Sequence, residues 1–230
     1  MKVVDIRDRD AFALAVHAVH DAPIVVQLPT VFVLLAAPSQ RGAAQLDASK
    51  TRLAGKNYGT AIGSLESFLA QADASQLPPE FSAPAHFVPM TGTFIRLRFR
   101  SPNFESPTIR RGTHQGVLLD GLHRELFKRI EASFLHDRPD PAWGHHNYSA
   151  PLCTSCNVSG DPDGSIVALD KALAFCRTRG VQLLMTCPQT ARELGSYPIL
   201  GYERDRVTVH REGPGLDSFK HRIPAHLRTW

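Results

Sequence analysis

Short apolar runs and runs with helical spacing alternate along this chain, separated by turn-forming residues. Apolar or alternating runs predict strands at residues 22–28, 31–37, 57–62, 93–99, 108–110, 181–186, 197–202 and 207–211. Apolar positions three and four apart predict helices over 10–20, 40–52, 116–135 and 165–179, and Ser64 is expected to cap another. Irregular connections are expected at 75–89 and 136–149. This order predicts an α/β or α+β fold with a single twisted mixed sheet flanked by helices.

Size and charge narrow the class of protein. The chain has 230 residues, of which 43% are hydrophobic and 21% are charged, so it suits one large domain or two small ones. No apolar run approaches the roughly 20 residues of a membrane span. The charged segment 5–10 near the start is unlike a secretory signal, so a cytoplasmic protein is expected. A net charge of +4 suits an anionic ligand such as a nucleotide, or RNA.

The four cysteines are expected to be free thiols. Cys153 and Cys156 form a C-x-x-C pair, and His145 and His146 precede it. A mixed zinc site would need further ligands, and the sequence has no second C-x-x-C pair and no helix-spaced pair of histidines. We therefore expect no metal bound by the protein's own side chains.

Two polar stretches are candidates for binding phosphate. Residues 151–160 run from an apolar strand end into hydroxyls, an amide and a glycine, which is typical of a phosphate-binding loop but also of an ordinary turn. Lys50, Arg52 and Lys56 bring three cations to an expected exposed helix end, where they would favour a polyphosphate. Positive charge at that end also complements the helix dipole, so the pattern alone favours an ordinary basic helix end.

The order of these motifs along the chain resembles the YrdC/YciO family. The resemblance covers about residues 10–215 and leaves 216–230 as a basic C-terminal tail, in which 219–230 show no clear structure. The matching segments are Leu28-Pro29-Thr30, Lys50-Thr51-Arg52, Ile109-Arg110, Thr154-Ser155-Cys156-Asn157-Val158-Ser159-Gly160 and Val209-His210-Arg211-Glu212-Gly213. Among them, the S-x-N segment that contains Ser155 and Asn157 is the most specific.

This resemblance implies an α/β sheet with a large concave cavity on one face. It also implies synthesis of threonylcarbamoyl-AMP from threonine, bicarbonate and ATP with Mg²⁺, which supplies a tRNA modification. By position, Lys50 and Arg52 would be the catalytic cations, and Thr30 would contact the amino acid. The nucleotide-binding residues that the resemblance implies are Lys56, Arg110, Ser155, Asn157 and Ser196.

The sequence departs from the family where the amino acid would bind. After the Pro-Thr pair the family has polar residues, whereas this chain has Val31, Phe32 and Val33. Apolar side chains cannot satisfy an ammonium group or a hydroxyl in a buried pocket. The middle residue of S-x-N, usually alanine, is Cys156, and residues 136–149 resemble an insertion. We therefore expect a divergent member with an altered amine substrate or without catalysis.

Two other functions remain open from the sequence. A YrdC-like protein without turnover could bind RNA or tRNA through Arg96, Arg98 and Arg100, which would share one face of a strand. That triplet is more typical of a solvated sheet face. A pseudoenzyme that binds ATP to support a partner, such as another tRNA-modification protein, is the other alternative.

Overall fold

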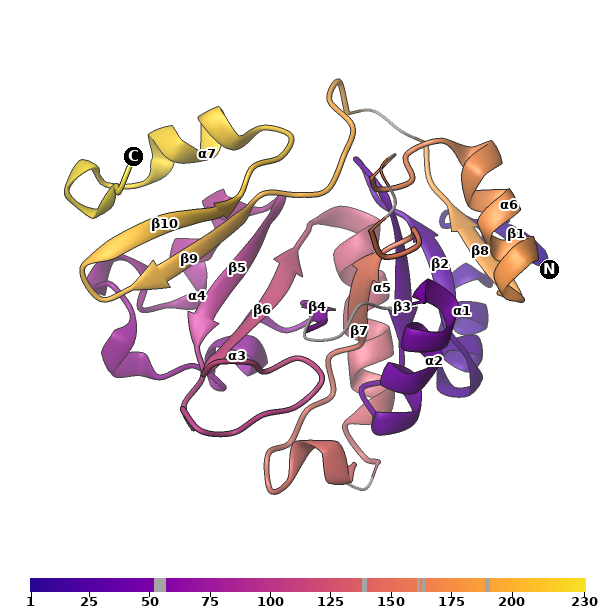
Figure 1. Ribbon diagram of the computed structural model, residues 1–230, viewed down its shortest axis with the longest axis horizontal. Helices are drawn as coiled ribbons and strands as arrows, with labels where there is room; N and C mark the ends of the chain where they lie inside the picture. Colours follow the sequence, from indigo (N-terminus) through magenta and orange to yellow (C-terminus); the bar gives the residue numbers. More distant parts are fainter. Residues whose placement is uncertain (52–56, 138–139, 161, 163, 189–190) are drawn as a thin grey trace.

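Ten strands form one mixed sheet in the computed structural model, which describes residues 1–51, 57–137, 140–160, 162, 164–188 and 191–230. The strands are β1 (Lys2–Asp5), β2 (Ile24–Gln27), β3 (Phe32–Ala36), β4 (Gly59–Ala61), β5 (Thr93–Arg98), β6 (Thr113–Leu118), β7 (Leu152–Ser155), β8 (Leu183–Thr186), β9 (Ile199–Glu203) and β10 (Arg206–Arg211). They follow the order β1-β8-β2-β3-β7-β4-β6-β5-β9-β10 (Figure 1). Parallel pairs such as β4/β6 and antiparallel pairs such as β3/β7 occur together, which confirms the predicted mixed sheet.

Seven α-helices in the described residues cover this sheet in three groups. They are α1 (Ala11–Asp21), α2 (Gln40–Lys50), α3 (Leu65–Leu69), α4 (Pro84–Phe87), α5 (Gly121–Phe134), α6 (Leu169–Arg179) and α7 (Leu216–Arg222). Helices α1 and α5 pack into one apolar cluster, α2 and α6 into a second, and α3, α4 and α7 into a third. The last group lies beside β5, β9 and β10 at the other end of the sheet from α6 (Figure 1).

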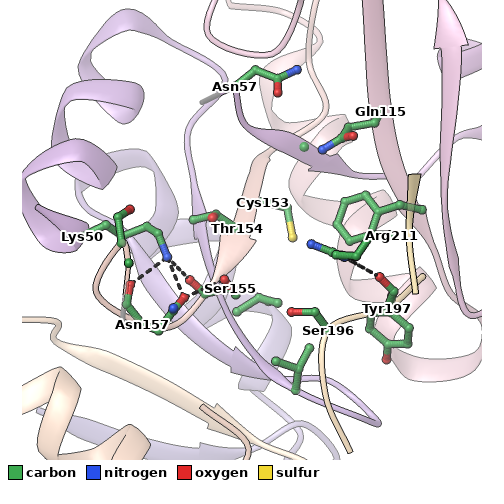
Figure 2. A pocket seen from close by; sticks show the side chains of 16 residues that line it. Lys50, Asn57, Gln115, Cys153, Thr154, Ser155, Asn157, Ser196, Tyr197 and Arg211 are labelled. Carbon is green, nitrogen blue, oxygen red and sulfur yellow. Dashed lines mark hydrogen bonds between the residues drawn. The ribbon is translucent and has the colours of Figure 1, made fainter. Parts of the chain in front are cut away.

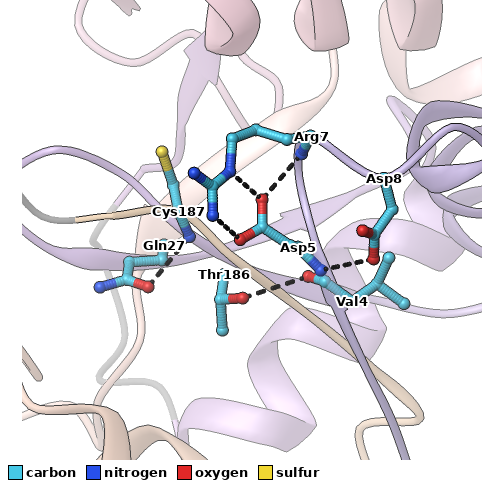
Figure 3. Close-up of polar contacts among 7 residues, drawn as sticks. All are labelled: Val4, Asp5, Arg7, Asp8, Gln27, Thr186 and Cys187. Atoms are coloured by element: carbon cyan, nitrogen blue, oxygen red, sulfur yellow. Dashed lines mark hydrogen bonds and ion pairs between the residues drawn. The ribbon is translucent and has the colours of Figure 1, made fainter.

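The N-terminal strand β1 closes one edge of the sheet by pairing in parallel with β8. Figure 3 shows the polar contacts at this edge, where the Asp5 carboxylate accepts two hydrogen bonds from the Arg7 guanidinium at 2.8 and 2.7 Å. These contacts lower the pKa of Asp5 to about 2. The Gln27 side chain accepts from the Cys187 backbone N–H at 3.1 Å, which ties β2 to the end of β8. The sequence pattern did not predict β1.

The helix expected over residues 116–135 is wrong in its first part. Residues 113–118 form β6, which pairs with β4 on one side and β5 on the other. Val117 and Leu118 are buried there, and an apolar run of this length does not distinguish a central strand from a buried helix. The chain leaves the strand at Leu119 and Asp120, and Gly121 adopts a positive φ of 54° as α5 begins.

The expectation that residues 219–230 lack clear structure is also wrong in part. Residues 216–222 form α7, and a short 3₁₀ turn follows at Ala225–Leu227. Phe219, Ile223 and Leu227 recur every four residues and are buried against β9 and β10 in the third cluster. Within α7 the two buried residues, Leu216 and Phe219, lie three positions apart, and this is the helical signal that the basic composition of the segment obscured.

Candidate functional site

The central strands place one row of side chains on a common face of the sheet. Val33 on β3 lies opposite Ser155 on β7, and Cys153 lies opposite Gly59 on β4. On the far side of β4, Gln115 of β6 lies opposite Arg96 of β5. Because successive side chains on a strand point to opposite faces, the register directs this row toward the same side.

These residues surround a cavity of about 430 Å³ (Figure 2). Its lining comprises Val31, Val33, Lys50, Asn57, Gly59, Phe94, Gln115, Cys153, Thr154, Ser155, Asn157, Ser159, Gly160, Ser196, Tyr197 and Arg211. A Cβ atom at Gly59 would stand 2.5 Å from the Phe94 ring, so only glycine leaves room for this ring in the cavity wall. The concave cavity implied by the resemblance is therefore present among the described residues.

Lys50 joins helix α2 to the turn that follows β7. Helix α2 begins at the Ser39 cap, whose hydroxyl accepts from the Gly42 N–H at 3.0 Å, and it ends where Thr51 adopts a left-handed φ of 48°. The Lys50 ammonium donates to Asn157 O at 2.7 Å, to Asn157 Oδ1 at 3.0 Å and to Ser155 O. In return the Ser159 backbone N–H donates to Lys50 O at 2.9 Å.

The expected exposed helix end is therefore wrong for Lys50, whose exposed fraction is 3%. The preceding turns of α2 pack against the sheet. The Lys50 side chain therefore points toward the S-x-N turn and not into solvent. In this arrangement Lys50 fixes the turn and brings positive charge to the cavity wall (Figure 2).

The S-x-N turn is ordered by its own side chains. Ser155 Oγ donates to Asn157 Oδ1 at 2.7 Å, and Asn157 Nδ2 donates to Val158 O at 3.0 Å. A second hydroxyl pair, Ser165 Oγ and Ser196 Oγ, lies 2.5 Å apart on the neighbouring wall. These contacts hold hydroxyl and amide groups at the end of β7, where phosphate oxygens could replace the present hydrogen-bond partners.

The opposite wall carries the guanidinium group of Arg211, and a second guanidinium, that of Arg96, is bonded to the lining residue Gln115. Arg211 donates to Tyr197 O through Nε at 3.0 Å and Nη2 at 2.6 Å, and its Cζ lies 5.6 Å from the centre of the Phe94 ring. Arg96 donates to Gln115 Oε1 at 3.0 and 2.6 Å. Partial burial, together with the charge of Arg96, lowers the pKa of Arg211.

Within the described ranges neither guanidinium has a carboxylate partner. Two neighbouring cations without a counter-charge favour an anion between this wall and the S-x-N turn. The cavity can therefore hold an extended anionic ligand that contacts both walls.

The predicted site residues divide into three groups. Lys50, Ser155, Asn157 and Ser196 come together around the cavity, although they derive from distant parts of the chain. Arg52 and Lys56 lie outside the described residues.

Arg110 and Thr30 do not line this cavity in the described part of the chain. Arg110 is exposed in the turn before β6, where its backbone pairs with Thr113, and the strand expected at 108–110 is reduced to this single bridge. Thr30 lines a second cavity of about 420 Å³, which shares Tyr197 with the first. The roles predicted for both residues stay predictions.

The sequence pattern indicated no role for four further residues that line the cavity, namely Arg211, Gln115, Asn57 and Phe94. Arg211 lay within the C-terminal segment that carried the resemblance, so motif order was a usable signal for it. The other three residues have no local pattern, because only the pairing of β4, β5 and β6 brings them to this face.

The C-x-x-C pair is buried in the sheet and at the start of the turn. Burial raises the pKa of the Cys153 thiol to about 12 and also raises the pKa of Cys156. Both thiols are therefore protonated at neutral pH, which makes them poor nucleophiles and poor metal ligands as they stand.

This sheet order and cavity define the class of fold: the chain has the YrdC/Sua5-like fold, as the resemblance predicted. Neither a protein-family model nor a curated protein sequence matches the chain. Solved structures do match it. The crystal structure of P. abyssi Sua5 complexed with L-threonine is similar with a TM-score of 0.72 and 15% identity, over 99% of this chain and 62% of that chain.

E. coli YciO is similar with a TM-score of 0.64 and 13% identity, over 92% of this chain and 93% of that chain. T. kodakarensis HypF is similar with a TM-score of 0.60 and 15% identity, over 90% of this chain and 24% of that chain. The chain thus spans less than two thirds of the Sua5 and HypF chains. Among the described residues, no helix is long and apolar enough to cross a membrane.

Proposed function

We propose that this protein forms a carbamoyl-adenylate from ATP, bicarbonate and an amine, in the manner of a threonylcarbamoyl-AMP synthase. The observation that carries the proposal is the contact of Lys50 with Ser155 and Asn157 on one wall of a cavity whose other wall carries Arg211. Distant motifs of the chain converge here on a site suited to a polyphosphate. The similarity to Sua5 and YciO supports the fold on which this convergence depends.

The proposed reaction has two steps, and the bonds formed and broken balance in each. The amine adds to bicarbonate and water leaves, which gives a carbamate. A carbamate oxygen then attacks the α-phosphorus of ATP, and the bond to the β-phosphate oxygen breaks to release pyrophosphate. In-line substitution of this kind depends on positioning and charge neutralisation more than on a strong acid or base.

The residues supply those two requirements. The S-x-N turn, held by Lys50, would bind phosphate oxygens through the hydroxyl of Ser155 and the amide of Asn157. Arg211 would neutralise an anionic group on the opposite wall. Ser196 would contact the nucleotide, and Thr30, across Tyr197, would contact the amino-acid end. Arg52, Lys56 and Arg110 remain candidates for the outer phosphates.

Mg²⁺ fits this site only as a partner of the nucleotide. The described residues that line the cavity include no aspartate or glutamate, so the protein offers only amide and hydroxyl oxygens. Mg²⁺ commonly keeps several waters and binds substrate phosphates. The ion would thus arrive with ATP and neutralise its phosphates.

Pyrophosphate release tests the proposal. The intact protein is incubated with ATP, Mg²⁺ and bicarbonate, and each of the twenty amino acids is added in turn. We expect release that requires both bicarbonate and an amine, and a loss of roughly 100-fold or more in Asn157→Ala. Asn103→Ala, at an exposed position outside the cavity, is the matched control. Absence of release with every amine would refute the enzymatic proposal, and ATP binding without turnover would favour the pseudoenzyme.

The tRNA partner stays a prediction. Arg96 donates to Gln115 Oε1, Arg98 forms an ion pair with Glu203 at 3.2 Å, and Arg100 lies 3.2 Å from the His146 ring nitrogen, so all three arginines already contact other side chains. These contacts favour catalysis over RNA binding as the main function. If RNA binding is the function, affinity for tRNA should fall steeply between 50 and 200 mM salt, as counterion release requires.

A further inference from the structure

The floor of the cavity is apolar, although both of its walls are polar. It consists of Val31, Val33, Phe94 and Cys153, and we refer to these four residues as the apolar floor. All four are at least nine-tenths buried, so little more than their cavity-facing surface remains open. The burial that raises the pKa of Cys153 to about 12 is consistent with this dry environment.

Two hydroxyl groups beside the floor, those of Ser155 and Ser196, already have partners. Ser155 Oγ is bonded to Asn157 Oδ1 at 2.7 Å, and Ser196 Oγ is bonded to Ser165 Oγ at 2.5 Å. The Arg96 guanidinium is bonded to Gln115 Oε1. A ligand group that rests on the floor therefore meets methyl groups, a thiol and an aromatic ring, and it finds its polar contacts only at the two walls.

We propose that the amine taken by this cavity is an amino acid with an apolar side chain of about the size of valine. This inference rests on the proposed function and names its substrate class. The phosphates would lie at the S-x-N turn, the carboxylate of the amino acid would face Arg211, and the side chain would rest on Val31, Val33 and Phe94. Conversion of the ammonium group to a carbamate removes the positive charge that such surroundings would disfavour.

Valine and threonine test this inference directly, because their side chains have nearly the same shape and differ in polarity. A threonine hydroxyl on the apolar floor would lose its bonds to water and gain none, whereas the corresponding methyl group of valine is stabilised by burial. An apolar pocket rejects an isostere with an added hydroxyl by about 100-fold at most. We expect this protein to bind valine roughly 10- to 100-fold more tightly than threonine.

Isothermal titration of the intact protein measures this preference. The first titration adds α,β-methylene-ATP with Mg²⁺, an analogue that cannot release pyrophosphate, and it tests nucleotide binding. Valine and threonine are then titrated separately, with and without the analogue. Nucleotide binding combined with threonine binding as tight as valine, or with no valine binding, would overturn the inference and leave the proposed nucleotide site standing.

Matched substitutions assign the preference to the floor. Val33→Thr adds one hydroxyl to the floor at nearly constant volume and should move the preference toward threonine by about 10-fold or more. Val26→Thr is the control, because Val26 lies on β2, is equally buried and does not line the cavity. If Val33→Thr does not fold, Val31→Thr makes the same test on the neighbouring floor residue.

The possible results separate the two proposals. Absence of nucleotide binding would refute the proposed function, whatever the amino acids do. Failure of valine to bind in either state of the protein would refute the apolar substrate class. A valine preference that Val33→Thr and Val31→Thr both leave unchanged would also refute it, because the apolar floor would then not recognise the side chain of the amino acid.

Discussion

Lys50 Nζ donates a hydrogen bond to Asn157 Oδ1 at 3.0 Å, and this bond joins two residues that are 107 positions apart. The Ser159 N–H returns a bond of 2.9 Å to the Lys50 carbonyl, so helix α2 and the S-x-N turn are tied in both directions. Lys50 of the K-x-R motif and the S-x-N turn thus form one structural unit. The lysine supports the turn as well as bringing positive charge to the cavity wall.

Removal of this ammonium group should weaken both the fold and the site. In Lys50→Met the carbonyls of Ser155 and Asn157 lose a charged donor, which costs about 2–3 kcal/mol of unfolding free energy. Nucleotide affinity should fall with it, because the turn loses its anchor. Urea unfolding and calorimetric titration of ATP measure the two effects. Lys128→Met, on the exposed side of α5, should leave both within about 0.5 kcal/mol of the original protein.

A stable Lys50→Met protein that binds ATP normally would show that the contact between α2 and the turn has no part in the site. Loss of stability without loss of ATP affinity would assign Lys50 a purely structural role.

Arg211 should matter for anion binding more than for stability. Its guanidinium has no carboxylate partner in the described chain, so Arg211→Gln leaves no opposite charge unpaired. The variant loses the contacts with Tyr197 O and the cation facing the cavity. We expect the dissociation constant for the amino acid, whose carboxylate would face Arg211, to rise about 10- to 100-fold, as for a charge-assisted hydrogen bond. Titration calorimetry checks this, with the exposed Arg177→Gln on α6 as control.

An Arg211→Gln protein with unchanged affinity for ATP and for the amino acid would place the anion elsewhere in the cavity. The remaining cations to test would then be Arg52, Lys56 and Arg110.

Most elements of the fold follow from the sequence because their apolar spacing is local. Residues 10–20 and 165–179 show helical spacing, and α1 and α6 form within them. Residues 116–118 were assigned to the helix because Val117 and Leu118 begin a short apolar run that does not distinguish a buried strand from a helix. The resemblance indicated the wall with Ser155 and Asn157, whose motif is contiguous. Gln115 and Phe94 reach the site only through strand register, which the sequence does not display.

The C-terminal segment should contribute to the stability of the domain. The Phe219 side chain is 8% exposed and packs in the cluster under β9 and β10, close to the backbone at Gly92 and Gly215. Phe219→Ala should lower the free energy of unfolding by about 3 kcal/mol, through lost burial and the cavity left behind. Urea unfolding measures it, and Ser218→Ala on the exposed side of α7 is the control. A change below about 0.5 kcal/mol would show that α7 is not packed as described.

Finally, stability should depend on pH through His114. This imidazole is fully buried between Phe68, at 4.5 Å between ring centres, and Phe99, at 5.6 Å, and neither ring nitrogen has a hydrogen-bond partner in the described residues. Burial lowers the pKa of His114 from 6.5 to about 3. The unfolded chain therefore binds a proton below pH 6.5 that the folded chain does not, so stability is full above pH 6.5 and falls as the pH drops toward 3.

Between pH 7.5 and 4.5 this linkage should remove about 2–3 kcal/mol of unfolding free energy, at about 1.4 kcal/mol for each unit below 6.5. Burial also lowers the pKa of His123 and of His146, which adds to the loss with the same sign. His114→Phe places an apolar ring between the two phenylalanines. It should reduce the loss of unfolding free energy between pH 7.5 and 4.5 by the contribution of His114. Urea unfolding at both pH values measures it, with the exposed His17→Asn as control. A slope that His114→Phe leaves unchanged would mean that this imidazole is protonated within the folded protein or is reached by water.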